Sequence, residues 1–85
     1  MTIEYILKEI EAVCSGINQF SQKNKDWALG YLQGRNENRF SEIEFELCFQ
    51  ILDMIFSKEK LPTGKELEEI YEEQFQRVIL GYKTM

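Results

Sequence analysis

The chain has 85 residues, 44% of them hydrophobic and 29% charged, and a net charge of −5 with no histidine. This length allows one domain that buries only about 60–65% of its unfolded surface, and the composition excludes a disordered chain. No stretch approaches the roughly 20 apolar residues that cross a bilayer, and acidic residues interrupt the N-terminal segment, which excludes a secretory signal. We therefore expect a single cytoplasmic domain over residues 1–85, without a membrane segment.

The first predicted helix covers residues 3–20. Its apolar side chains recur at intervals of three and four residues, so they gather on one side of a helix. They are Ile3, Ile6, Leu7, Ile10, Val13, Cys14, Ile17 and Phe20. Thr2 can cap the start through its hydroxyl. The polar run SQKNKD at 21–26 then interrupts the pattern, and Asn24 or Asp26 offers a stop or a new cap.

A second, shorter helix is predicted for residues 26–33. Trp27 and Tyr31 lie one turn apart on the same side of it. Gly34 is placed to end this helix in the left-handed conformation, which glycine adopts without steric cost. Residues 34–40, GRNENRF, have no periodicity and are typical of a connecting loop.

The third predicted helix begins sharply after Ser41. Ser41 and Glu44 have the spacing of a capping box, in which each side chain accepts a hydrogen bond from the backbone N–H of the other residue. Ten of the fourteen residues from 43 to 56 are apolar, and they cover an arc of about 240° on a helical wheel. The remaining polar stripe consists of Glu42, Glu46, Gln50, Asp53 and Ser57. Such a helix is expected at the centre of the domain, with neighbours on both flanks.

A second copy of the chain is the alternative cover for one flank of this helix, that of Phe45, Phe49 and Phe56. Large exposed apolar patches are uncommon in monomers, whereas small homodimers are common. We favour a monomeric core, and a structural or regulatory homodimer assembled through the third helix is the alternative.

The fourth predicted helix follows Pro62, which breaks the chain. Thr63 caps the helix, and Glu66 completes a second capping box. The helix is expected to end near Gly81. Its core-facing residues are Leu67, Ile70, Tyr71, Phe75, Val78, Ile79 and Tyr82. Because no strand pattern occurs, the sequence predicts an all-α fold, a compact bundle of about four helices with the third helix central.

Catalytic chemistry finds little support in the sequence. Without histidine, no Ser–His or Cys–His pair can activate a nucleophile. Glu69 and Glu73 lie one turn apart, as metal-binding carboxylates can, but the Glu-x-x-His partner motif is missing, so we interpret them as a solvated helix face. Cys14 and Cys48 are expected to be buried and reduced; a disulfide is the alternative, and zinc would need thiols from several chains. We expect a protein that is not an enzyme and binds no metal or cofactor.

The negative charge is concentrated in the second half of the chain. Residues 1–41 hold five acidic and five basic side chains, whereas residues 42–85 hold ten acidic against five basic. Because polyanions require basic patches, nucleic acid is not expected as a partner. Acidic residues of the third and fourth helices can form a surface without an interleaved base. These residues are Glu42, Glu46, Asp53, Glu66, Glu69, Glu72 and Glu73.

This acidic surface has two interpretations. In the first, the charges only keep a small protein soluble. In the second, they bind a basic protein, with Trp27 and Tyr31 as aromatic anchors near the loops, since aromatic anchors and complementary charge are typical of protein recognition. We favour the second interpretation.

The stretch FSEIEFELCFQILDMIF, preceded by a short helix and followed by the capped acidic segment LPTGKELEEIYEEQF, resembles the small helical immunity proteins of bacterial toxins such as colicin D and contact-dependent inhibition effectors. The resemblance covers roughly residues 18–80 and is one of size, acidity and helix pattern, without a diagnostic motif. It implies a non-enzymatic inhibitor that covers the active site of a basic toxin nuclease domain with carboxylates. A DNA-mimicking antagonist of the anti-CRISPR kind is a further alternative, although such a mimic would carry more acids.

Overall fold

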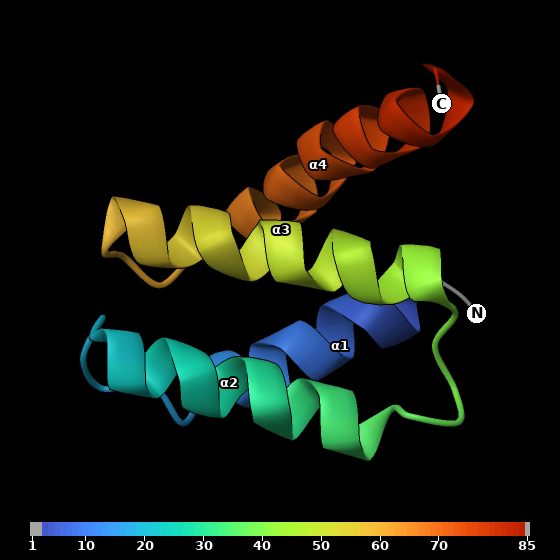
Figure 1. Cartoon of the computed structure of the whole chain (residues 1–85). Coiled ribbons are helices and arrows are strands. Elements are labelled where there is room, and N and C mark those ends of the chain that lie inside the picture. Colours follow the sequence, from blue (N-terminus) through green and yellow to red (C-terminus); the bar gives the residue numbers. More distant parts are fainter. Residues whose placement is uncertain (1–2, 85) are drawn as a thin grey trace.

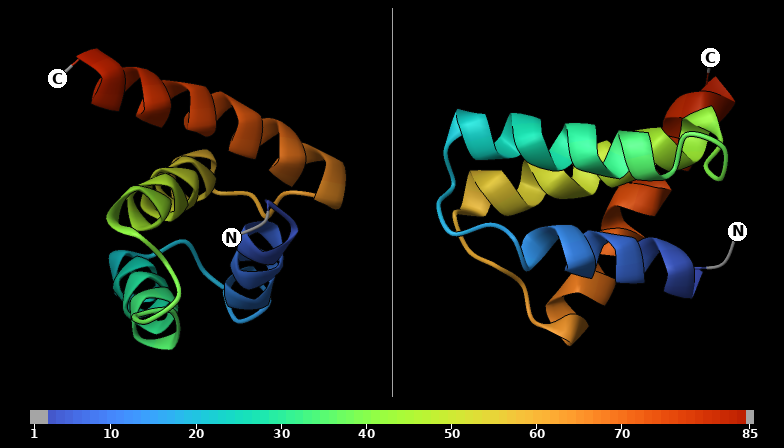
Figure 2. Two further views of the ribbon diagram at one scale, coloured as in Figure 1. Left: turned by 90° about the vertical axis from the view of Figure 1, so that its right-hand side faces the viewer. Right: turned by 90° about the horizontal axis from the view of Figure 1, so that it is seen from below.

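Four helices form the structure, a computed structural model that describes residues 3–84 and the side chains of residues 3–81. They are α1 (Ile3–Cys14), α2 (Gln22–Arg35), α3 (Glu42–Lys58) and α4 (Gly64–Thr84). Helix α3 contacts all three other helices and lies between α4 and α2, while α1 lies beside α3 and also contacts α4 (Figures 1 and 2). Helix α4 crosses α3 obliquely, and its C-terminal half projects away from the bundle (Figure 1). The predicted all-α bundle with a central third helix is therefore confirmed.

Helix α1 is shorter than predicted, because it ends at Cys14 rather than near residue 20. The chain turns at Ser15 and Gly16, yet Ile17 remains buried, and the ring of Phe20 contacts Phe56 edge to face at 5.6 Å. Apolar residues as far as residue 20 therefore still pack into the core, although the helix itself ends at Cys14. The proposed Thr2 cap lies outside the described residues.

Helix α2 is longer than predicted at both ends. Its N-cap is Ser21, whose hydroxyl accepts from the backbone N–H of Asn24 at 3.2 Å, so the proposed caps at Asn24 and Asp26 are wrong. The helix continues through Gly34, and no described glycine has a positive φ, so a left-handed end at Gly34 is also wrong. Asn36 ends the helix instead, because its fully buried side chain donates to the Leu32 carbonyl at 2.9 Å.

Both predicted capping boxes are present. Ser41 donates its backbone N–H to Glu44 at 2.8 Å and accepts from the Glu44 N–H at 3.3 Å. Thr63 and Glu66 repeat the exchange at 3.0 and 3.2 Å. Between the two helices, Glu59 ends α3 in the left-handed conformation with φ of 52°. These local hydrogen bonds determine where α3 and α4 begin and how the chain turns between them.

The aromatic flank of α3 is covered largely from within the chain. Phe56 is buried, and the half-buried Phe45 and Phe49 continue a series of ring contacts that starts at Phe40, with centroid distances of 5.4 and 6.0 Å. Phe45 and Phe49 keep part of their surface exposed, so a contact with a second copy of the chain stays open on this flank. The homodimer stays a prediction that sedimentation across a concentration series can test.

Helix α4 buries a different set of residues from the predicted one. Leu67, Ile70, Tyr71 and Val78 are buried as expected. Phe75 is 39% exposed, however, and Gln74 is only 2% exposed, so Gln74 occupies the core position predicted for Phe75. The helix also continues past Gly81 to Thr84. The predicted core role of Tyr82 concerns a side chain outside the described part. Helix α4 crosses α3 obliquely (Figure 2), and its buried residues form a narrower strip than the apolar pattern indicates.

Candidate functional site

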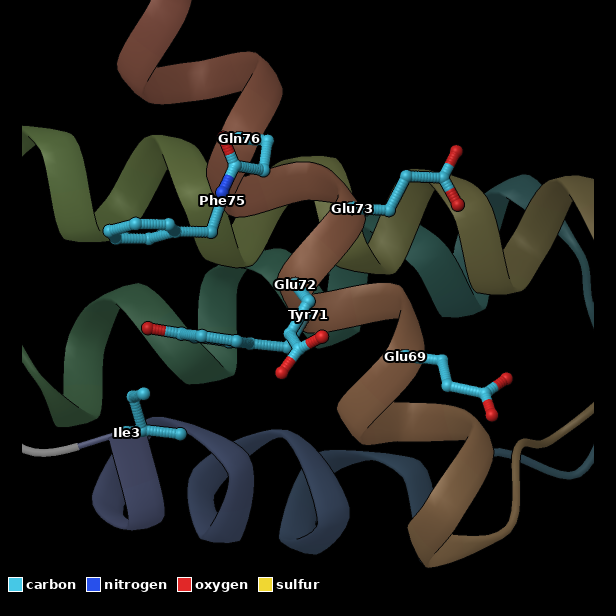
Figure 3. A pocket seen from close by; sticks show the side chains of 7 residues that line it. All are labelled: Ile3, Glu69, Tyr71, Glu72, Glu73, Phe75 and Gln76. Atoms are coloured by element: carbon cyan, nitrogen blue, oxygen red, sulfur yellow. The ribbon is translucent and has the colours of Figure 1, made fainter.

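The most distinctive surface lies along α4 where it passes the start of α1. Tyr71 and Phe75 stack with their ring centroids 5.8 Å apart and an interplanar angle of 17°. Together with Ile3 and Gln76 they line an open recess of about 600 Å³, which we call the α4 recess. Its remaining lining residues are Glu69, Glu72 and Glu73. The two rings project to one side of α4, whereas Glu69 and Glu73 project to the other (Figure 3).

A smaller recess of about 130 Å³ adjoins the first, because both are lined by Tyr71 and Phe75. Its walls are almost entirely apolar and come from α1, α3 and the C-terminal half of α4. The side chain of Glu44, from the first turn of α3, lies at its edge. An apolar strip therefore follows α4 for several turns, with carboxylates beside it.

The carboxylates of α4 are not free of basic neighbours, contrary to the prediction. Arg77 lies 3.2 Å from Glu73, and Lys60 lies 3.6 Å from Glu66. The hydrogen bond from the backbone of Thr63 lowers the pKa of Glu66, whose carboxylate serves mainly to cap its own helix. Glu69 and Glu72 are exposed and form no ion pair with any residue in the described part of the chain. Both carboxylates are therefore available to a partner.

The acidic residues of α3 do not join this surface. Asp53 forms an ion pair with Lys25 of α2 at 2.5 Å and lines a different recess, beside Phe20 and Phe56. Glu46 accepts a hydrogen bond from Gln50 at 3.0 Å, and Glu42 is exposed in the first turn of α3. The seven carboxylates thus divide between two flanks of α3 and do not form the continuous acidic surface that the sequence predicts.

The predicted aromatic anchors also lie elsewhere. Trp27 and Tyr31 are 45% and 42% exposed, and they stack at 5.4 Å on the outer side of α2. The Trp27 ring rests against Gly16, where an added Cβ would lie only 2.7 Å from its Cη2 atom. Among the described residues α2 and α4 do not contact each other, since α3 separates them (Figure 2). These anchors and the α4 carboxylates therefore belong to different surfaces.

A polar cluster between α1 and α2 was not predicted from the sequence. The buried carboxylate of Glu9 accepts from Arg35 Nε at 2.9 Å, and this hydrogen bond raises the pKa of Arg35. Tyr5 donates to Asn36 Oδ1 at 3.1 Å and accepts from Arg39 Nη1 at 2.6 Å. The position of Glu9 within the apolar arc of the first helix could have indicated its burial. The hydrogen-bond partners of Glu9 and Tyr5 lie 26 to 34 positions away in the sequence, and no local pattern indicates these pairs.

The cysteines are buried and unpaired, as predicted. Burial raises the pKa of Cys14 to about 11 and that of Cys48 to about 12, so neither is a thiolate near neutral pH. Within the described residues, no three groups of His, Cys, Asp or Glu are arranged to hold a metal ion. No helix in the same part of the chain has the length and apolar composition needed to cross a membrane.

The chain matches no family model, no curated protein and no solved structure. The α4 recess offers the best-defined combination of exposed aromatic surface and carboxylates.

Proposed function

We propose that this protein is a non-enzymatic inhibitor of the immunity type, which binds a basic nuclease-type toxin and covers its active site with the acidic side of α4. The observation that carries the proposal is that three exposed carboxylates, Glu69, Glu72 and Glu73, line the same recess as the half-exposed ring of Phe75, although Glu69 and Glu73 project to the other side of α4 from that ring (Figure 3). Such carboxylates can occupy positions that the phosphates of a nucleic acid would take on the toxin.

Electrostatics and burial support this use of α4. Exposed carboxylates attract a basic partner over a range set by the Debye length, about 8 Å at physiological salt, and they accelerate association. An aromatic side chain next to them supplies apolar area that the partner can desolvate, which charge alone does not. The acidic half of the chain thus combines long-range attraction with a short-range anchor.

The first test measures binding to the protein that an affinity capture from the native host recovers. Replacing Glu69, Glu72 and Glu73 by Gln preserves shape and removes charge. We expect the association rate to fall and its salt dependence to flatten, because complementary charges are screened by salt. A matched control replaces Glu42, Glu46 and Asp53 by Gln or Asn, which removes the same formal charge from the other flank of α3.

The two triple variants separate the interpretations of the acidity. If the α4 variant loses affinity and the α3 variant does not, the α4 surface is the contact. Unchanged affinity and salt dependence in both would leave the charges with a solubility role only, and the contact would then lie elsewhere, with Trp27 and Tyr31 as the next surface to test. A captured partner with no basic nuclease domain would contradict the immunity function itself.

A further inference from the structure

Exposed apolar side chains mark one end of the α4 recess. Ile3 is 53% exposed and Phe75 is 39% exposed, although both belong to helices whose other apolar residues are mostly buried. The ring of Tyr71 is buried beneath this surface and stacks with that of Phe75, which holds the Phe75 ring in a defined orientation. The recess is therefore a preformed apolar site that an incoming side chain could fill.

The charges around the recess select among possible occupants. Glu69, Glu72 and Glu73 line it, and Glu44 lies at the edge of the adjoining smaller recess. A second copy of the chain using the same face would bring two acidic rims together, because a two-fold contact pairs identical surfaces. The repulsion disfavours self-association there and favours a partner that carries lysine or arginine beside its apolar residues.

The shape of the recess selects the conformation of that partner. The two recesses extend along α4 from Glu69 to Ile79, which corresponds to about 15 Å of helix. The described residues contain no strand, so this part of the chain has no sheet edge to which an extended segment could add. An amphipathic helix with apolar side chains at i, i+4 and i+7 can place successive anchors along such a strip.

We propose that the α4 recess binds a basic amphipathic helix of the partner, with an apolar side chain of that helix packed against the exposed parts of Ile3 and Phe75, on either side of the Tyr71 ring (Figure 3), and its basic residues reaching Glu69, Glu72 and Glu73. This inference rests on the proposed function, because it specifies which structural element of the basic partner makes the contact. Under this inference, tight binding requires the apolar contact with Ile3 and Phe75 as well as the charges.

The experiment uses the full chain and a synthetic helix-forming peptide of about 15 residues, in which leucines form one face and lysines the other. A second peptide has the same composition in an order that gives no apolar face. We expect the amphipathic peptide to bind and to shift backbone amide NMR signals at the start of α1 and along residues 69–79. Equal binding of the two peptides, or shifts centred on Trp27, would overturn the inference.

Two variants then separate the apolar anchor from the charges. Phe75→Ala should weaken peptide binding about tenfold, as expected for a central aromatic anchor, whereas Trp27→Ala, which removes an equally exposed aromatic ring from α2, should change it by less than about twofold. Ile3→Ala serves as a second test of the anchor, and far-UV circular dichroism verifies that each variant is folded.

The failures of the two proposals are distinguishable in these assays. If the Gln substitutions at Glu69, Glu72 and Glu73 weaken binding of the peptide and the captured partner while Phe75→Ala changes neither, the acidic contact stands and the helix-anchor inference is wrong. If the Gln substitutions leave the captured partner bound equally well, the acidic side of α4 is not the contact, and the part of the proposed function that assigns binding to α4 is wrong. If both the Gln substitutions and Phe75→Ala weaken binding of the captured partner, both proposals are supported.

Discussion

Removing the side chain of Ile51 tests the reasoning about the central helix. Ile51 is 0% exposed, and Ile51→Ala deletes three carbon atoms from the centre of α3. At about 0.8 kcal/mol for each buried methylene, the lost transfer free energy is about 2.4 kcal/mol. The cavity left behind adds to this, so the free energy of unfolding should fall by about 3–4 kcal/mol.

That loss is large for a domain of this size, whose total stability is expected to be roughly 4–13 kcal/mol. Urea denaturation followed by circular dichroism gives the change directly, and the melting temperature should fall by about 15–25 °C. Ile3→Ala is a matched control, because it makes the same chemical change at a side chain that is 53% exposed. We expect that control to cost less than about 0.5 kcal/mol. Equal losses for the two variants would refute the central position of α3.

Further predictions concern the glycines and the cysteines. Gly30→Ala should stabilise α2 by about 0.5–1 kcal/mol, because an added Cβ there meets no atom within 4 Å. Gly16→Ala should instead displace the ring of Trp27 and change the tryptophan fluorescence. Unchanged fluorescence would contradict the close contact between Gly16 and Trp27. Cys14 and Cys48 should react slowly with thiol reagents unless denaturant is added. Their pKa values are raised to about 11 and about 12, so the unfolded chain loses thiol protons first above about pH 9, and stability should fall as pH rises from there. Replacing both cysteines by Ala should make that fall shallower, and an equally steep fall would assign it to other groups.

The polar cluster between α1 and α2 explains how a chain with a small core holds these two helices in register. Glu9 is buried beside Arg35. Because a buried carboxylate without a compensating charge is destabilising, the fold depends on the ion pair between these two residues. Asn36 is fully buried and is hydrogen-bonded to both Leu32 and Tyr5. Since an unsatisfied buried polar group costs free energy, these bonds favour one relative placement of the helices over others.

Residues close together in the sequence carried the information that could be read without a structure. The capping boxes at Ser41 and Thr63 involve partners three residues away, so their spacing alone predicts the starts of α3 and α4. The apolar arc of residues 43–56 predicted the central helix in the same way, because burial on most sides leaves a periodic pattern in the sequence. Helix number, type and order followed from such local signals.

Contacts between distant residues decided the rest. Whether Phe75 or Gln74 of α4 faces the core depends on the angle at which α4 crosses α3, and no spacing within α4 specifies that angle. The same crossing leaves Phe75, Tyr71 and Ile3 around one opening and creates the α4 recess (Figure 3). The position of α3 between α2 and α4 likewise separates Trp27 from the α4 carboxylates. Local hydrogen bonds and apolar periodicity thus determined the elements, whereas helix packing determined which side chains share a surface.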